Sequence, residues 1–381
     1  MSLKKRVDNI KGRPYGGSSR KAGKMYHSLP FKGMENFSHH RGGTRERIDN
    51  IARIVGGVEG LRILDLGCSV GGLSLGMLEN GAESVIGIDY DPESITVARV
   101  AMKTLGYIKK GSFINEKITI DLIKQLPEFD LIIWMSQWMW SVKQGGIDYG
   151  KDLLFEVSRH TKGELKNGTR MIFETGANDG MAKIKGSTQD NIERWLFENT
   201  AYEKIVRLPS TKGWMNRDIF YCTHPLTRIK STRRAACSII ERIGRNKVKK
   251  TFRKIPKNYE WMLPREVKAL KMLEPYDNFP KLLEVGSNYI VMNFVGRRNQ
   301  VNPLEMKGQV QVILQNMRKA GIKQHRDINR KNFLALNGKL YLIDFGWAIF
   351  DGEDINKARQ HRNLSKKTDE EVLSHLFKIK L

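Results

Sequence analysis

The sequence predicts two domains of mixed α/β composition, a doubly wound domain with a parallel sheet followed by a small two-lobed α+β domain. In the first part, over residues 45–224, short apolar strands alternate with helical segments, which is the pattern of a parallel sheet wrapped by helices. A glycine-rich turn directly follows the first of these strands. In the second part, strand pairs stand on either side of an amphipathic helix.

Length and composition set the class of protein. A chain of 381 residues is long for one domain and comfortable for two. No apolar run approaches the ~20 residues of a membrane span, and the basic N-terminus lacks the apolar core of a secretory signal. The three cysteines have no paired spacing, which indicates a reducing compartment and no metal cluster. We therefore expect a cytoplasmic protein.

The net charge of +25 is the strongest bulk feature. Residues 1–24 hold eight Lys or Arg and one Asp, and residues 226–260 hold twelve and two Glu. Such clusters bind nucleic acid or an anionic membrane surface, or they are a solvated tail and a phosphate-handling site. We favour the phosphate-handling site for the second cluster. The tail stays open between the two readings, although no nucleic-acid motif supports a nucleic-acid partner.

These features predict three segments: a flexible basic segment over 1–38, the first domain over 39–224 and the second over 225–381. Helical spacing or apolar strand composition identifies the elements of the first domain. Its predicted strands are 61–67, 84–90, 129–136 and 169–176, and its predicted helices are 45–55, 74–81, 92–106 and 152–168.

Two acids and a set of glycines mark the carboxyl ends of the first two strands. Asp65 precedes a turn that contains Gly67 and Gly71, and Asp89 ends the next strand. Glycines there let the backbone approach a ligand closely, and an acid after the second strand can bind the two ribose hydroxyls of a nucleoside. The pattern alone does not separate this ligand from a dinucleotide.

Four segments together resemble the Rossmann-like class I S-adenosylmethionine-dependent methyltransferases: DLGCSVGG, GIDYDPESI, FDLIIWMSQWMW and LKNGTRMIFETG. The resemblance covers about residues 45–224 and adds a closing hairpin over 202–225. It implies that S-adenosyl-L-methionine is the cofactor. It also implies a contribution from the acid that follows the third strand of that family, which is Glu116 or less favourably Asp121 here. The implied cofactor-binding residues are Asp65, Gly67, Ser69, Gly71, Asp89, Tyr90 and Glu116.

Methyl transfer depends mainly on positioning. A phosphate acceptor needs cationic donors rather than a general base, whereas an amine or hydroxyl more often needs a base. In this family acceptor-binding residues often precede the first strand. The candidates are Tyr26, His27, His39, His40, Arg41 and Arg45, with Arg217 on the hairpin. We expect Trp134 in the core and Trp138 at the wall of the cofactor or acceptor pocket.

The second domain carries residues suited to phosphoryl transfer, which needs positioning and charge neutralisation. Asp327 can orient an acceptor hydroxyl, and Asn332 and Asp344 can bind a metal. A lysine paired with Glu266 can hold the nucleotide phosphates. Strand alternation places Lys250, rather than its rival Lys249, on the apolar face.

HRDINRKN and LIDFG, at their spacing, resemble the protein-kinase-like superfamily. The resemblance implies ATP and Mg²⁺ as cofactors and an adenine-contacting hinge over 292–295 that includes Met292 and Phe294. No G-x-G-x-x-G precedes Lys250, so the Arg-rich loop 231–236 is the candidate cover for the phosphates. Only 35 residues follow Gly346, which favours a small or glycan hydroxyl over a peptide.

The order of the two domains resembles the bifunctional enzymes that terminate bacterial O-antigen polysaccharides, without their long C-terminal helical region. It implies phosphorylation of a glycan or small-molecule hydroxyl followed by methylation of that phosphate. An anionic membrane surface or a glycosyltransferase would be a further partner, with attachment at the inner membrane as the alternative location. Two independent activities, or an RNA or small-molecule methyltransferase with an accessory kinase domain, are the competing hypotheses.

Overall fold

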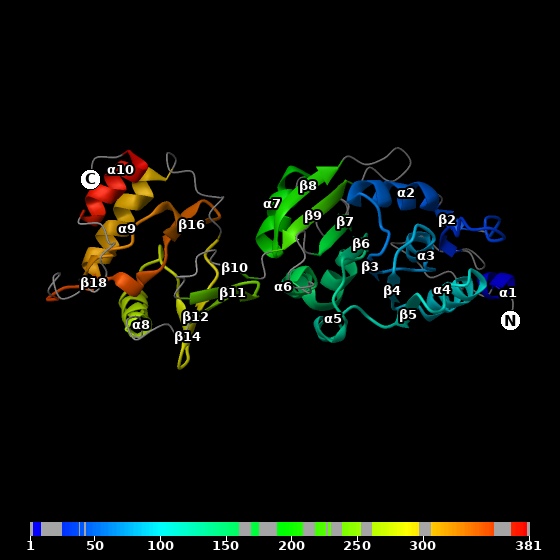
Figure 1. The fold of residues 1–381 in the computed structure, drawn as a ribbon, viewed down its shortest axis with the longest axis horizontal. Helices are drawn as coiled ribbons and strands as arrows, with labels where there is room; N and C mark the ends of the chain where they lie inside the picture. The colour runs from blue at the N-terminus through cyan, green and yellow to red at the C-terminus, as the bar shows by residue number, and fades with distance from the viewer. Residues whose placement is uncertain are drawn as a thin grey trace. The chain divides into compact units, whose positions relative to one another are not determined.

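The computed structural model describes residues 3–8, 25–37, 39–41, 43–159, 169–174, 189–208, 218–225, 228–229, 238–252, 261–296, 306–353 and 367–378. The chain divides into two compact units, residues 1–226 and 227–381. Both units have the mixed α/β composition that the sequence predicts (Figure 1).

A seven-stranded sheet forms the centre of the first unit. Neighbouring strands are parallel except that β9 runs antiparallel to β7 and β8, so the predicted closing hairpin is present. In spatial order the strands are β5 (Gly111–Asn115), β4 (Ser84–Asp89), β3 (Arg62–Leu66), β6 (Leu131–Met135), β7 (Arg170–Glu174), β9 (Ile219–Pro225) and β8 (Tyr202–Leu208).

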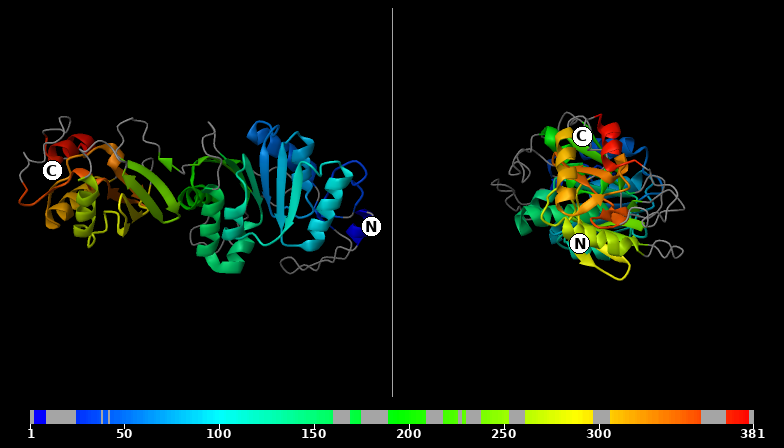
Figure 2. Two further views of the ribbon diagram at one scale, coloured as in Figure 1. Left: turned by 60° about the horizontal axis from the view of Figure 1, so that its bottom comes forward. Right: turned by 90° about the vertical axis from the view of Figure 1, so that its left-hand side faces the viewer.

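Helices cover both faces of this sheet (Figure 2). Alternate strand residues belong to different buried clusters, as the two-residue period of a strand requires: Ile133 packs into one, Trp134 into the other. The first cluster includes α2 (Thr44–Val55), α3 (Gly72–Glu79) and α4 (Pro92–Thr104), and the second includes α5 (Ile120–Gln125), α6 (Trp138–Arg159) and α7 (Gln189–Asn199). The Rossmann-like fold class is confirmed.

Helix α6 begins at Trp138, well before the predicted start at residue 152. Non-helical backbone at Gly146 (φ 85°, ψ 174°) interrupts it, and this break hides the longer helix from a search for uninterrupted helical spacing.

The prediction of a flexible segment over residues 1–38 is wrong for its described parts. Helix α1 (Leu3–Asp8) buries Val7, and strand β1 (Met25–His27) pairs in parallel with β2 (His39–Arg41). Apolar side chains between residues 25 and 34 enter the first core: Met25, Leu29, Phe31 and Met34. Residues 9–24 lie outside the described part.

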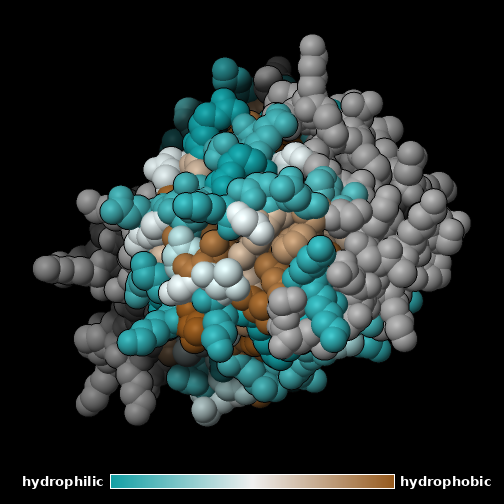
Figure 3. All heavy atoms as spheres, turned by 90° about the vertical axis from the view of Figure 1, so that its right-hand side faces the viewer, coloured by the Kyte–Doolittle hydropathy of each residue, from teal (hydrophilic) through white to brown (hydrophobic). Residues whose placement is uncertain are grey.

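The face of the first unit that carries α1 and α4 is mostly hydrophilic, with hydrophobic side chains visible near its centre (Figure 3). Lys103, Lys109 and Lys110 are exposed at the end of α4 and beyond it, beside the exposed Ile108. An anionic partner for this charge remains a prediction. Within the described residues, no helix is long and apolar enough to cross a membrane.

The second unit begins with a five-stranded antiparallel sheet and one helix, α8 (Met262–Met272). In spatial order the strands are β10 (Arg228–Ile229), β11 (Ser238–Gly244), β12 (Lys247–Phe252), β14 (Tyr289–Asn293) and β13 (Leu282–Val285). The sheet's central strand β12 carries both candidate lysines.

The remaining elements of the second unit include two helices, two short strand pairs and two 3₁₀ turns. They are α9 (Lys307–Lys319), β15 (Ile322–Gln324), η3 (Arg330–Asn332), β16 (Phe333–Leu336), β17 (Lys339–Leu342), η4 (Phe345–Trp347), β18 (Ile349–Phe350) and α10 (Asp369–Phe377). Strand β15 pairs with β18, and β16 pairs with β17. One buried cluster joins them to α8, so both lobes of this unit share a core.

Candidate active sites

The first candidate site lies at the carboxyl edge of the seven-stranded sheet, where β3 and β4 end. Asp65 is buried, and its Oδ2 accepts a hydrogen bond from Ser74 Oγ at 2.6 Å. Gly67 has a φ of 82°, and a Cβ there would lie 2.7 Å from Gln137 Cγ. Only glycine fits this turn, which is why the predicted motif has a glycine at this position.

The carboxylate of Asp89 organises the same turn. It accepts hydrogen bonds from the backbone N–H of Ser69 (2.9 Å) and of Asp91 (3.0 Å). The side-chain amide of Asn115 donates to Asp89 O at 3.1 Å. The structure therefore gathers the ends of β3, β4 and β5 at one place, as a nucleoside site would require.

The residues predicted to flank this turn lie at its surface. Tyr90, Glu116 and Asp121 are all exposed. At the end of β5 it is Asn115, a residue that the sequence analysis did not single out, whose side chain contacts Asp89. In the sequence, only the position of Asn115 at the end of strand β5 could have pointed to it.

Burial raises the pKa of Asp65 to about 7, and the nearby negative charge of Asp89 adds to this effect, while the hydrogen bond from Ser74 opposes it. Asp65 is therefore poised to lose its proton when a cation binds beside it. The ammonium group of S-adenosylmethionine, the predicted cofactor, would be such a cation.

We predict that binding of S-adenosylhomocysteine, whose amino group stays protonated near neutral pH, weakens about tenfold from pH 8 to pH 6. The sign follows because the ammonium prefers the ionised carboxylate, which is depleted below a pKa of about 7. Calorimetric titration at both pH values measures it. Asp65→Asn should bind more weakly and without this pH dependence. A flat profile for the wild type would contradict the assignment.

Strand pairing brings part of the predicted acceptor set side by side: His27 lies opposite Arg41, and His39 lies opposite Met25. Arg45 forms an ion pair with Glu79 and donates to Pro30 O at 2.5 Å, which ties α2 to its surroundings. His27 lies half-buried in β1, and His39 Nδ1 lies 3.0 Å from Phe37 O. The side chains of Tyr26, His40 and Arg41, and all of Arg217, lie outside the described part.

A buried polar cluster that the sequence analysis missed lies further along the same edge. Arg47 Nη2 donates to Glu174 Oε2 at 2.6 Å, and both side chains are buried. Ser136, at the end of β6, donates its hydroxyl to Glu174, at the end of β7. Gln137 follows directly and packs against Gly67, so this cluster borders the candidate cofactor turn.

The expectation that Trp138 walls a pocket is wrong. Its side chain is fully buried, its indole N–H donates to Gly150 O at 2.8 Å, and its ring packs edge-on against Trp195 at 4.9 Å. Trp134 is fully buried in the core, as expected.

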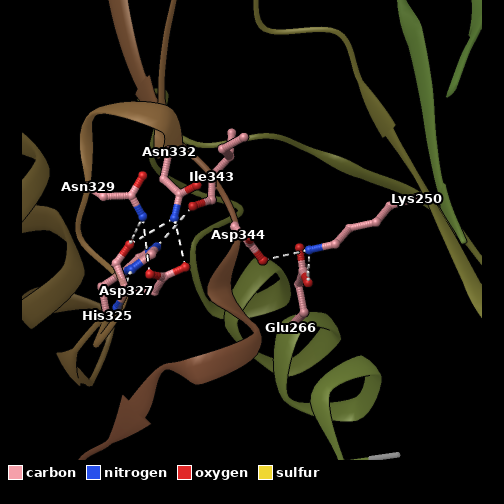
Figure 4. A network of polar contacts seen from close by, with 8 residues as sticks. All are labelled: Lys250, Glu266, His325, Asp327, Asn329, Asn332, Ile343 and Asp344. Atoms are coloured by element: carbon pink, nitrogen blue, oxygen red, sulfur yellow. Dashed lines mark hydrogen bonds and ion pairs between the residues drawn. The ribbon is translucent and has the colours of Figure 1, made fainter. Parts of the chain in front are cut away.

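The second candidate site centres on Lys250, which β12 directs toward helix α8 (Figure 4). Its ammonium lies 2.5 Å from Glu266 Oε2 and 2.7 Å from Asp344 Oδ1. Burial lowers the pKa of Lys250, but the two carboxylates outweigh burial and raise it above its ordinary value. Lys250 is therefore charged. Lys249 instead lies over the Tyr289 ring at 4.0 Å.

Asp327 lies in a loop held by two asparagines (Figure 4). Asn332 Nδ2 donates to Asp327 Oδ2 and Asn329 Nδ2 donates to Asp327 Oδ1, both at 3.1 Å. His325 Nδ1 accepts from the N–H of Asp327 at 3.3 Å, so the opposite ring nitrogen carries the proton and donates to Ile343 O at 2.9 Å. The imidazole thus connects the Asp327 loop to the residue before Asp344.

Burial raises the pKa of Asp327, and the negative charge of Asp344 adds to it, although His325 and the asparagine hydrogen bonds oppose both. Two acids and an amide near one another favour a cation. Mg²⁺ takes oxygen ligands of this kind, so Asp344 and Asn332 fit the predicted ion. The described residues contain no group of three or more His, Cys, Asp or Glu placed to hold a metal, so phosphate oxygens and water would supply the other ligands of the ion.

Asp369, the first residue of α10, binds the backbone of the loop that carries Asp327. Its carboxylate accepts the backbone N–H of His325 at 2.5 Å and of Arg326 at 3.2 Å, and it is 5% exposed. Arg326 has a φ of 70°, a strained conformation that needs outside support. The sequence analysis gave α10 no role, because the local pattern T-D-E-E signals only a helix start.

The predicted hinge, residues 292–295, lies at the end of strand β14 and directly after it. Met292 is buried within the sheet, and the Arg242 guanidinium lies 3.8 Å from the Phe294 ring. The backbone then turns at Gly296 (φ 104°), where a Cβ would lie 1.9 Å from Ala335 O. The connection between the two lobes therefore passes directly against β16. Loop 231–236 lies outside the described residues.

Comparisons with known proteins give one family for each unit. Residues 58–149 match the family described as methyltransferase domain, and residues 228–360 match the RIO domain family. The chain is 32% identical over 161 residues to the O-antigen chain terminator bifunctional methyltransferase/kinase WbdD of Escherichia coli, covering 42% of this chain and 21% of that protein. The chain thus spans about a fifth of the length of this curated relative.

Two further similarities are more limited. The ubiquinone biosynthesis O-methyltransferase of Alkalilimnicola ehrlichii is 50% identical over 54 residues, which is 14% of this chain and 22% of that protein. A crystal structure of WbdD aligns with a TM-score of 0.41 and 19% identity, covering 99% of this chain and 85% of that one.

Proposed function

Since the chain joins a methyltransferase domain to a RIO kinase-like domain, we propose that it is a bifunctional enzyme. Its second unit phosphorylates a hydroxyl of a glycan or small molecule with ATP, and its first unit methylates the resulting phosphate with S-adenosylmethionine. The observation that carries the proposal is the network of Lys250, Glu266 and Asp344 beside Asp327, in the same chain as the Asp65 and Asp89 turn.

In the proposed first step, the acceptor oxygen attacks the γ-phosphorus of ATP and the bond to the β–γ bridging oxygen breaks. Asp327 orients the hydroxyl and receives its proton, and ADP leaves. Lys250, held by Glu266, faces the phosphates. Mg²⁺, bound by Asp344 and Asn332, would neutralise charge on the β and γ phosphates.

In the proposed second step, an oxygen of the phosphate monoester attacks the sulfonium methyl carbon. The carbon–sulfur bond breaks, its electron pair stays on sulfur, and S-adenosylhomocysteine leaves. No general base is needed, because the phosphate oxygen is already ionised at neutral pH. The buried Arg47 already pairs with Glu174 at 2.6 Å, so other cationic donors would have to orient the phosphate acceptor.

The substrate class comes from the Escherichia coli relative, whose name describes a terminator of O-antigen chains. We carry a glycan acceptor over to this chain as part of the proposal. The charge of +25 would also suit an acceptor or partner with negative charge.

The order of the two steps gives a testable prediction. The purified chain, incubated with a panel of glycans, ATP, Mg²⁺ and S-adenosylmethionine, should add phosphate and then methyl to the same acceptor, read by mass spectrometry. Without ATP no methyl group should appear on unphosphorylated glycans. Without S-adenosylmethionine the product should stop at the phosphate.

Methylation of the same acceptor in the absence of ATP would contradict the sequential mechanism and favour two independent activities. Methylation of RNA with no transfer to any glycan would instead favour a nucleic-acid methyltransferase with an accessory kinase domain. Steep loss of RNA binding with added salt would accompany that outcome.

A further inference from the structure

Helix α8 carries Glu266, which pairs with Lys250, and directly before it Arg265, which points to a different part of the second unit. Arg265 Nη1 donates to Ala348 O at 2.6 Å and lies 2.7 Å from Glu353 Oε2. Both acceptors follow Asp344 by a few residues. One side chain therefore ties the helix that presents Glu266 to the segment that follows Asp344.

The segment that receives Arg265 is itself well ordered by local contacts. Glu353 Oε2 also accepts the N–H of Phe350 at 3.1 Å, and the N–H of Glu353 donates to Phe350 O at 3.1 Å. Burial raises the pKa of Glu353, but the hydrogen bonds from Arg265 and from the Phe350 N–H outweigh burial, so that its pKa lies below its ordinary value. Glu353 is therefore an anion at neutral pH.

Aromatic contacts strengthen the same junction. The Arg265 guanidinium lies 5.3 Å from the Phe350 ring, and the Lys268 ammonium, one helical turn on, lies 4.0 Å from it. These are distances of cation–π pairs. At the start of the helix, Trp261 packs edge-on against Trp347 at 5.0 Å. Helix α8 is thus held against η4 and β18 along its first two turns.

The junction continues into the loop that carries Asp327. Phe350 belongs to β18, which pairs with β15 through Ile322. Strand β15 ends at Gln324, directly before His325. Arg265 therefore connects three parts of the candidate site: the helix of Glu266, the segment after Asp344, and the strand that leads into the catalytic loop.

We propose that Arg265 and Glu353, together the α8 clamp, are positioning residues that hold α8 where Glu266 meets Lys250. The phosphoryl-transfer site is then assembled by contacts within the unit, and neither a bound nucleotide nor a modified loop is required to bring the helix in. This inference rests on the proposed kinase function of the second unit.

If the Arg265–Glu353 pair only stabilised the fold, its loss would change mainly the melting temperature. The Arg265–Glu353 pair is partly exposed, with side chains at 24% and 32%, and such pairs stabilise a fold only slightly. If the clamp positions the helix, its loss should change nucleotide binding and the mobility of α8 much more than the melting temperature.

The test uses Arg265→Ala, Glu353→Ala and the double variant in the full chain. We expect Arg265→Ala to raise the KM for MgATP about tenfold, since small misplacements of positioning groups have large kinetic effects. The double variant should lose no more than Arg265→Ala alone, because the two residues act as one unit. Amide hydrogen exchange of α8 should accelerate in all three variants, and Arg265→Lys should recover part of the loss.

Lys339→Ala is the matched control, because it removes another partly exposed ion pair of this unit, to Asp277 at 3.2 Å, away from α8. It should leave KM and α8 exchange unchanged. Additive losses in the double variant, or unchanged α8 exchange in Arg265→Ala, would overturn the clamp. The exchange measurement needs no catalysis, so absence of kinase activity in the wild type would reject the proposed function while the clamp is still tested.

Discussion

Asp327→Asn is expected to abolish phosphoryl transfer and to leave methyl transfer to a chemically phosphorylated acceptor intact. The carboxylate is the proton acceptor of the proposed first step, and a positioned base contributes about 10²–10⁴-fold. An asparagine amide has nearly the same shape but cannot accept the proton. It would also turn a donor toward the side-chain amide of Asn332 or Asn329, which now donate to Asp327.

Two assays measure this prediction: phosphate transfer from ATP to the acceptor, and methyl transfer to the same acceptor supplied as its phosphate monoester. Asp277→Asn is the matched control, since Asp277 is a largely exposed acid of the same unit. It should behave as the wild type in both assays. Retained phosphorylation in Asp327→Asn would remove Asp327 from the mechanism. Loss of methylation of the pre-phosphorylated acceptor would show that the two activities are not separable steps.

Local periodicity was sufficient to predict which of the two lysines pairs with Glu266. Side chains alternate across a strand, so Lys250 had to share a face with Val248 and Phe252. In the structure Lys250 lies between Glu266 and Asp344. The Lys249 ammonium lies over the Tyr289 ring on the other face of the sheet. The motif around Asp65 was predictable for a similar reason, because strand, turn and glycines are adjacent in the chain.

Contacts between distant segments could not be predicted in the same way. Arg47 and Glu174 are 127 residues apart, and each looks locally like an ordinary polar residue at the surface of a helix or at the end of a strand. The prediction for Trp138 was wrong for a related reason. Its place just after the third predicted strand suggested a pocket wall, but helix α6 begins there and the indole is buried in the core. Burial depends on packing, which a local pattern does not specify.

The N-terminal segment shows how composition can mislead. Its basic composition predicted a flexible segment over residues 1–38, yet the apolar residues Met25 and Phe31 are buried in the first core. The prediction used the overall composition of the segment and did not consider the positions of its few apolar residues. Spacing between apolar residues is the more reliable guide to burial.

Asp369→Asn is expected to reduce the turnover of phosphoryl transfer strongly while changing the KM for MgATP little. Asp369 holds the backbone N–H groups of His325 and Arg326, and these residues set the path of the chain into Asp327. The amide has one oxygen instead of two, so one of these buried N–H groups loses its acceptor, at a cost of about 1–3 kcal/mol. Lys250, the predicted phosphate-binding residue, lies on strand β12 and pairs with Glu266 on α8, so we expect the KM for MgATP to change little.

Thr368→Ala provides the control that separates loop positioning from loss of helix α10. The Thr368 hydroxyl accepts the N–H of Glu371 and caps the same helix end, whereas Asp369 accepts the N–H groups of the loop. Losing such a cap costs about 1 kcal/mol. Both variants should therefore lower the melting temperature, but only Asp369→Asn should lower kcat, at a temperature where each is fully folded. Equal losses of kcat in the two variants would mean that α10 supports the fold alone. The two substitutions alter the same helix turn, but only Asp369→Asn removes an acceptor from the N–H groups of His325 and Arg326. A loss of kcat in Asp369→Asn alone would therefore mean that the Asp369 carboxylate holds the loop that carries Asp327.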